Sequence, residues 1–144
     1  MTQKATQYPS CSLGRRLAAM LYDSFLLFAV IFMAAWLLLI IFGQEVAATP
    51  NPLINIYYIA VAFLFFGWFW THGGQTLGMR VWRVQVTDER GEPISWQQAA
   101  IRFAVSILSW ICVAMGFLWA IFDKENRGWH DLASKTRLVV LPKK

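Results

Sequence analysis

Three long apolar segments, separated by polar turns, dominate the hydropathy pattern of this chain. The first is an unbroken run over residues 24–42 without charge, Pro or Gly. As an α-helix its 19 residues would extend about 28 Å at about 1.5 Å per residue, which is close to the hydrocarbon thickness of a bilayer. Residues 17–23 before it are also mostly apolar. Together the two stretches predict a membrane-spanning helix over residues 17–42.

The second and third apolar segments predict two further helices, over residues 53–71 and 99–122. The second has no charge, and its Tyr and Trp residues lie near its two ends, where aromatic side chains prefer the membrane interfaces. The third is preceded by Ser95 with Gln98 three residues later, a spacing typical of a capping box at a helix start.

The polar segments complete the expected organisation. Residues 72–98 form a cytoplasmic loop in which the β-branched piece 81–87 predicts a strand, and residues 136–141 predict a second strand. Residues 1–13 are expected to be a flexible tail and residues 142–144 a short C-terminal tail, around a single membrane domain over residues 14–141. The predicted class is an all-α integral membrane protein with three apolar helical segments and a small cytoplasmic β element.

Composition and charge agree with an integral membrane protein, and we expect its location to be the bacterial cytoplasmic (inner) membrane. Apolar residues make up 58% of the chain and charged residues 15%, which is unlike a soluble globular domain. The net charge is +5, and its basic residues cluster outside the apolar runs. We therefore expect contact with anionic lipid headgroups at the cytoplasmic face rather than with nucleic acid. A homo-oligomer or another membrane protein is a possible further partner.

Charge counting leaves two topologies open, both with a cytoplasmic N-terminus. Three plain spans would divide the 13 Lys and Arg residues into seven inside and six outside. A third segment that turns back within the bilayer would place all of them inside, as the positive-inside rule favours, and would bring the two strands to one side. Against this alternative, residues 99–122 are long enough for an ordinary span and contain no Pro.

Two charged residues stand at the start of the first segment. Arg16 and Asp23 are seven residues apart, so they lie on nearly the same face of a helix. Ionisable side chains at or within a span usually face protein, water or a partner charge. Alternatively, Asp23 complements a helix N-terminus and Arg16 anchors the chain to headgroups.

Three sequence pieces together resemble the RDD family of small membrane proteins over residues 14–141. They are Arg16-Leu-Ala-Ala followed by Asp23, the loop motif formed by Gly74, Gln75, Thr76, Leu77 and Gly78, and Phe122-Asp123 followed by Gly128-Trp-His-Asp131-Leu-Ala. The resemblance implies that Arg16 and Asp23 are the family's Arg and first Asp. It places the second Asp at Asp131, with Asp88 as the alternative. Transport of unidentified ligands has been suggested for the family, and sodium–proton antiport is attributed to some members.

Other chemistries find little support. Gly73 and Gly78 have the glycine spacing of a phosphate loop, but Met79 and Arg80 follow where such a loop needs a Lys and then a Ser or Thr. His72 and His130 have no ligand partners at metal-site spacing. We expect no enzyme activity, no metal and no cofactor, and free thiols at Cys11 and Cys112.

Two functional hypotheses remain open. In the first, Arg16, Asp23, Arg102 and Asp131 form a polar cluster in which a membrane carboxylate, with Asp23 as the candidate, exchanges a proton for a cation. So few helices would require a homo-oligomer to enclose a pathway. In the second, the same residues form a structural network in a non-transporting scaffold or assembly protein.

Overall fold

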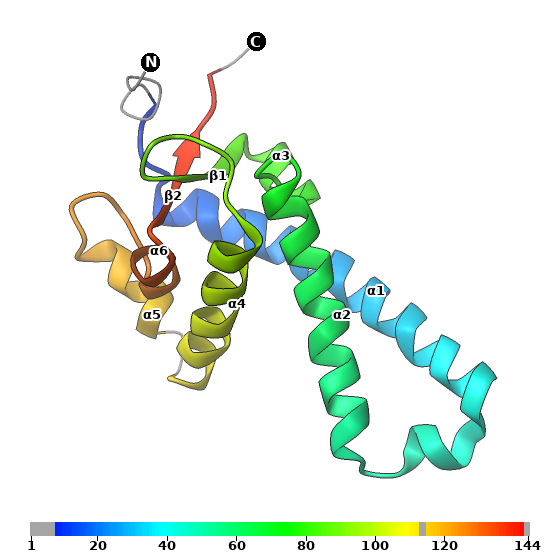
Figure 1. Ribbon diagram of the computed structural model, residues 1–144. Helices are drawn as coiled ribbons and strands as arrows, with labels where there is room; N and C mark the ends of the chain where they lie inside the picture. Colours follow the sequence, from blue (N-terminus) through cyan, green and yellow to red (C-terminus); the bar gives the residue numbers. More distant parts are fainter. Residues whose placement is uncertain (1–7, 113–114, 143–144) are drawn as a thin grey trace.

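Two long helices form the body of the protein, and short elements gather at one end of it (Figure 1). The computed structural model describes residues 8–112 and 115–142. The elements in chain order are α1 (Leu13–Ala48), α2 (Pro52–Thr71), α3 (Leu77–Val81), β1 (Val84–Asp88), α4 (Trp96–Ile111), α5 (Met115–Leu118), the 3-10 helix η1 (Trp119–Ile121), α6 (Trp129–Ser134) and β2 (Thr136–Val140). We call α3, β1, α6 and β2 the polar cap.

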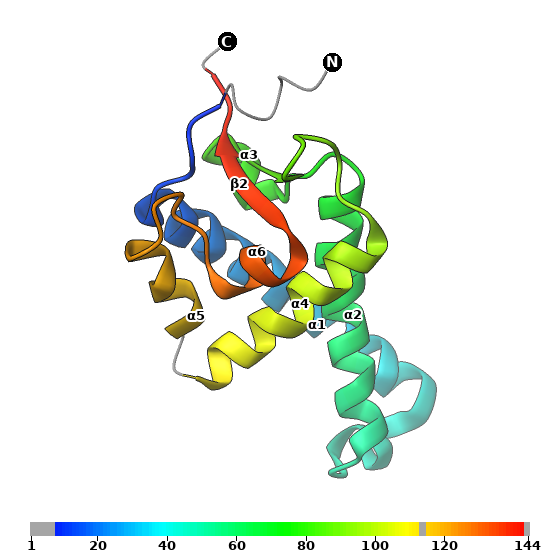
Figure 2. The ribbon, with the colours of Figure 1, turned by 60° about the vertical axis from the view of Figure 1, so that its left-hand side comes forward.

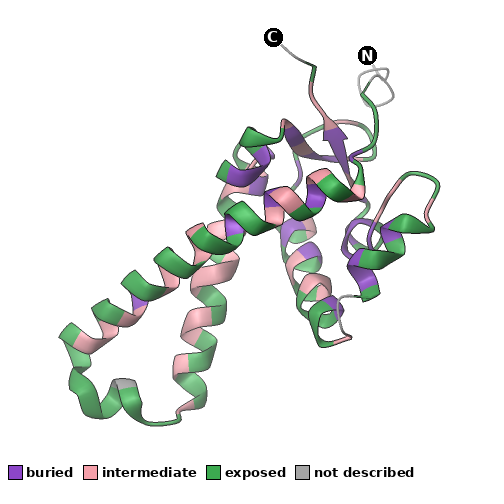
Figure 3. Cartoon of the chain, turned by 180° about the vertical axis from the view of Figure 1, so that it is seen from behind, coloured by how far each residue is buried: buried purple, intermediate pink, exposed green. Residues whose placement is uncertain are grey.

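The first two predicted spans are present as helices. Residues Leu13–Val46 of α1 and the whole of α2 are long and apolar enough to cross a membrane. Figure 3 shows that exposed and half-exposed residues cover both helices away from the polar cap, whereas buried residues concentrate near it. Many exposed side chains on α1 are large and apolar, including Phe25 and Phe28 at 70% and 72% exposure. Such a surface suits lipid rather than water.

Helix α1 is longer than the predicted span 17–42. Residues that we expected to form a turn continue the helix to Ala48 beyond a kink at Gly43, whose φ is 79°. Glycine tolerates this angle because it has no Cβ. Helix α2 agrees with the predicted span 53–71, and its N-cap is Asn51, whose side chain accepts a hydrogen bond from the Leu53 N–H.

The third apolar segment is bent rather than a single straight helix. The predicted capping box at Ser95 and Gln98 is present at the start of α4, and the direction of α5 and η1 differs from that of α4 by 109°. Residues 113–114 of the bend lie outside the described residues. Helix α5 contacts α4, and it also contacts α6, which belongs to the polar cap. The third segment therefore returns to the end of the molecule where it began. The described part of the chain thus contains two helices long and apolar enough to span a membrane, or three if the bent pair counts as one span.

The two predicted strands pair with each other in antiparallel orientation, with Val84 opposite Val140 and Asp88 opposite Thr136. Strand β1 starts later than predicted because α3 occupies residues expected to precede or begin it. The end of the expected N-terminal tail is also ordered, since Ser10 bridges Val139 and the Cys11 N–H donates to Leu138 O at 3.0 Å. The tail's residues 1–7 lie outside the described residues.

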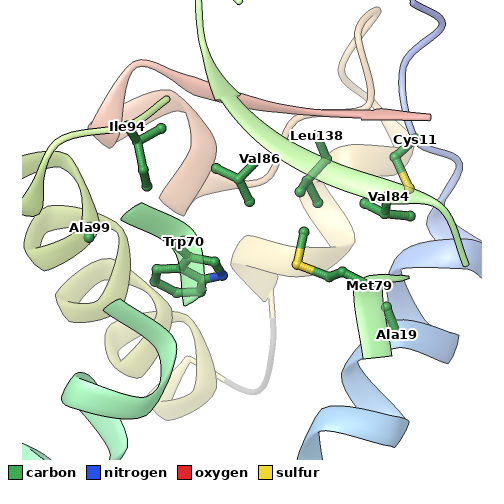
Figure 4. Close-up of a cluster of buried hydrophobic side chains, with 9 residues drawn as sticks. All are labelled: Cys11, Ala19, Trp70, Met79, Val84, Val86, Ile94, Ala99 and Leu138. Atoms are coloured by element: carbon green, nitrogen blue, oxygen red, sulfur yellow. The ribbon is translucent and has the colours of Figure 1, made fainter. Parts of the chain in front are cut away.

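A small core attaches the polar cap to the helices. Figure 4 shows Val84, Val86 and Leu138 of the sheet facing Trp70 of α2 and Met79 of α3. Val86 is fully buried and Val84 is 1% exposed. This packing holds the end of α2 and the start of α1 under the sheet, where the candidate site lies.

Candidate functional site

Asp131 lies between two arginines that come from different helices. Arg16 Nη1 donates to Asp131 Oδ2 at 2.5 Å, and Arg102 Nη1 donates to Asp131 Oδ1. The Gly128 N–H also donates to Oδ2 at 2.9 Å. We call Arg16, Arg102 and Asp131 the Asp131 network. Asp131 is 0% exposed and both arginines are 3% exposed, so the network is shielded from solvent.

The fold brings the network together from three helices. Arg16 is in the first turn of α1, Arg102 in the second turn of α4 and Asp131 in the first turn of α6. Figure 2 shows α6 between the start of α1 and α4, in agreement with these contacts.

Each arginine also has a second partner. Arg16 Nη2 donates to Asn126 O at 2.5 Å, and Arg102 Nη1 donates to Thr136 Oγ1 at 2.9 Å. The Arg102 guanidinium lies 5.1 Å from the centre of the Trp70 ring, within range of a cation–π interaction.

The network contains two cations and one anion. Burial opposes ionisation of Asp131, but attraction to Arg102 and Arg16 and the Gly128 hydrogen bond outweigh it and hold the pKa of this carboxyl well below its usual range. His130 Nε2 lies 3.5 Å from Asp131 Oδ1. Burial lowers the pKa of His130 to about 3, although Asp131 opposes the shift. His130 is therefore neutral at pH 7 and does not add to the charge.

Asp23 belongs to a separate cluster. Its Oδ2 accepts a hydrogen bond from the Thr76 hydroxyl at 2.5 Å, and its Oδ1 accepts one from the Gly78 N–H at 3.0 Å. Thr76 is the N-cap of α3 and accepts from the Met79 N–H at 3.2 Å. Asp23 therefore complements the start of α3, a favourable place for a carboxylate. The structure does not bring Asp23 together with Arg16 in one network.

The loop motif connects α1 to the sheet. A Cβ at Gly78 would lie 2.5 Å from Ala19 O, so only glycine lets α3 approach α1 this closely. Gly74 has a φ of +70°, and a Cβ there would lie 2.5 Å from Val86 O. Gln75 Nε2 donates to Val84 O at 2.7 Å. With Thr76 bonded to Asp23, each of these four predicted motif residues has a structural contact.

Asp88, the alternative second Asp, lies in a turn. Its Oδ1 accepts hydrogen bonds from the N–H groups of Arg90 and Glu92, both at 2.8 Å. Asp131 is thus the aspartate that the fold places with Arg16. The sequence pattern did not predict the contacts of His130, Thr136 and Trp70 with the Asp131 network, although the position of His130 next to Asp131 in the motif was a signal.

Within residues 8–112 and 115–142, no three His, Cys, Asp or Glu side chains form a group that could hold a metal.

A partly open cavity of about 670 Å³ lies between α1, α2 and α4, and its volume is typical of small-molecule sites. Most of its wall is apolar, and its charged and titratable side chains are those of Arg16, Asp23, Tyr58, Arg102 and His130. The cavity is therefore adjacent to both polar clusters.

Comparisons with known proteins identify the family. A model of the RDD family matches residues 11–135. The chain is 35% identical over 97 residues to the uncharacterized protein YxaI of Bacillus subtilis (strain 168), a match that covers 67% of this chain and 62% of that protein. No solved structure is matched. The family match covers most of the chain and includes Arg16, Asp23 and Asp131, and the chain therefore belongs to the RDD family.

Proposed function

We propose that the Asp131 network serves assembly of this membrane protein, by holding the polar cap on the helices, and does not exchange ions. The observation that carries the proposal is the saturation of Asp131. Both of its oxygens accept hydrogen bonds from Arg16, Arg102 and Gly128, and the side chain has no exposed surface. A cation that approached the Asp131 carboxylate would also approach the guanidiniums of Arg16 and Arg102. Coulomb repulsion from these two positive charges would oppose its binding.

We further propose that the chain is a multi-pass protein of the bacterial cytoplasmic membrane with both termini cytoplasmic. The bent third segment and the pairing of β1 with β2 support this orientation, because they bring the loop after α2 and the end of the chain to one end of the molecule. With the N-terminus at that end, the described Lys and Arg residues gather on one side, as the positive-inside rule favours. Anionic headgroups are the expected partners of that side.

Proton-coupled cation transport is the second candidate function, and Asp23 is the residue that favours it. Asp23 lines the cavity and lies on a helix of membrane-spanning length. A homo-oligomer would then be needed to enclose a complete pathway. In this alternative, protonation of Asp23 would break or weaken its contacts with Thr76 and Gly78.

Flux measurements distinguish the two functions. Wild-type protein and the Asp23→Asn variant are reconstituted in liposomes that contain a pH-sensitive dye, and sodium or potassium gradients are applied. A sodium–proton ionophore added last shows that the vesicles are sealed. We expect proton flux at the level of empty liposomes for both proteins and lower thermal stability for the variant. Cation-dependent flux in the wild type that a folded Asp23→Asn variant lacks would establish transport through Asp23 and refute a non-transporting assembly role for the protein.

A further inference from the structure

The cavity has a charged end and an apolar end. Arg16 and Arg102 line the end beneath the polar cap, whereas Ile31 of α1 and Ile59 of α2 line the part farther along the helices. Ile31 follows Arg16 by 15 residues on α1, which corresponds to about 22 Å at 1.5 Å per residue. This length exceeds the hydrocarbon of one leaflet, which is about 15 Å or half of the bilayer core.

The Asp131 network at the charged end has an excess of positive charge. Two guanidiniums share the single carboxylate of Asp131, and the neighbouring His130 is neutral at pH 7. Both arginines line the cavity. An anionic group at this end would therefore supply the missing negative charge beside them.

Three other polar side chains of the wall, those of Asp23, Ser24 and Ser106, already form hydrogen bonds within the protein. Both oxygens of Asp23 accept hydrogen bonds from the start of α3. The hydroxyls of Ser24 and Ser106 donate to the carbonyl groups of Met20 and Arg102 on their own helices, each at 2.7 Å. Beyond the charged end, the wall therefore presents mainly apolar surface to an occupant.

From this polarity profile we propose that the cavity binds one anionic phospholipid from the surrounding bilayer. Its phosphate lies at the Arg16 and Arg102 end, and one acyl chain extends between α1 and α2 toward Ile31. An apolar helix from a second copy would leave the guanidinium charge without a partner. A free anion would leave the apolar length of the cavity empty. The proposal does not depend on whether the protein transports ions.

The test compares lipids that share acyl chains and differ in headgroup. Delipidated full-length protein in a mild detergent is mixed with dioleoylphosphatidylglycerol, with dioleoylphosphatidylcholine or with inorganic phosphate. Native mass spectrometry measures the bound lipids, and thermal melting measures stabilisation. We expect a one-to-one phosphatidylglycerol complex with an affinity on the order of tenfold higher than that of phosphatidylcholine, as one or two basic side chains acting on an anionic lipid would produce.

Two alanines of α2 provide a matched pair of variants. Ala62 lines the cavity, whereas Ala60 is exposed on the same helix outside the lining. Ala62→Phe should reduce phosphatidylglycerol binding to the phosphatidylcholine level, and Ala60→Phe should bind as the wild type does. If Ala62→Phe does not fold, the smaller change Ala62→Leu serves the same purpose with a partial loss.

Several results would overturn the proposal. Equal binding of the two lipids would remove the role of the charged end, and unchanged binding by folded Ala62 variants would place the lipid elsewhere. Stabilisation by inorganic phosphate alone, equal to that by phosphatidylglycerol, would indicate a simple anion site. A dimer that is lost in Ala62→Phe and insensitive to lipid would show that a second copy occupies the cavity.

Discussion

Neutralising Asp131 should destabilise the protein more than removing either of its arginines. Asp131→Asn keeps the shape of the side chain but leaves the guanidiniums of Arg16 and Arg102 buried without an anion. Arg16→Met or Arg102→Met instead leaves one cation and one carboxylate, a balanced pair. The order of the three variants therefore reports the charge imbalance of the network.

The magnitudes follow from burial. Removing one partner from a buried ion pair costs about 3–5 kcal/mol in the free energy of unfolding, because the remaining charge is uncompensated. We expect this range for Asp131→Asn, since all three residues are at most 3% exposed. Each arginine variant loses charged hydrogen bonds of about 1.5–3 kcal/mol, but it also removes guanidinium repulsion and desolvation. We therefore expect a net loss of about 1–3 kcal/mol.

The double variant Asp131→Asn with Arg102→Met tests the reasoning directly. Because it removes one of the two unpaired cations, its loss should be smaller than the sum of the single losses by at least about 1 kcal/mol. Unfolding is followed by tryptophan fluorescence in mixed detergent and sodium dodecyl sulfate micelles, and Trp70 beside Arg102 is one reporter. Glu89→Gln, at an exposed acid, is the charge-matched control. A loss below about 1 kcal/mol for Asp131→Asn, or an equal loss for Arg102→Met, would refute the assigned role of the network.

Three further predictions concern the other contacts. Gly78→Ala should lower the free energy of unfolding by about 1–3 kcal/mol, because its Cβ would lie 2.5 Å from the Ala19 backbone oxygen. Gly14→Ala is the control, since a Cβ at Gly14 would have no atom within 4 Å. Equal melting temperatures of the two variants would contradict the close approach of α3 to α1. Thr76→Val and Asp23→Asn should each lower the free energy of unfolding by about 1–2 kcal/mol, because each removes a contact at the start of α3. The loss in the double variant should be smaller than the sum of the two single losses. A loss equal to that sum would show that the two side chains act independently. Lowering the pH from 7 to 5 should reduce stability by about 2 kcal/mol through His130, because the unfolded imidazole binds a proton below about pH 6.5 while the folded one, with a pKa of about 3, does not. His130→Asn should remove this part of the acid loss in unfolding titrations and His72→Asn should not; the same pH dependence in both variants would exclude His130 as its source.

Local patterns were sufficient to locate the helices of the membrane region. The predicted span 53–71 agrees with α2, and Ser95 with Gln98 correctly predicted the start of α4. Such signals are local because apolar length and capping residues act within a few turns of one helix. The two strands were also predicted, and they pair with each other in the structure.

The partners of the charged residues depended on the tertiary structure. Sequence spacing placed Arg16 and Asp23 on one face of α1, yet Arg16 pairs with Asp131, 115 residues away, and Asp23 pairs with Thr76, 53 residues away. The contact of Arg16 requires α6, and the contact of Asp23 requires the start of α3. The positions of these two short helices come from packing rather than from a periodic sequence pattern. A sequence identifies which side chains are costly to bury, but which groups compensate them is decided where distant segments meet, because electrostatic and hydrogen-bond energies depend on distances in space.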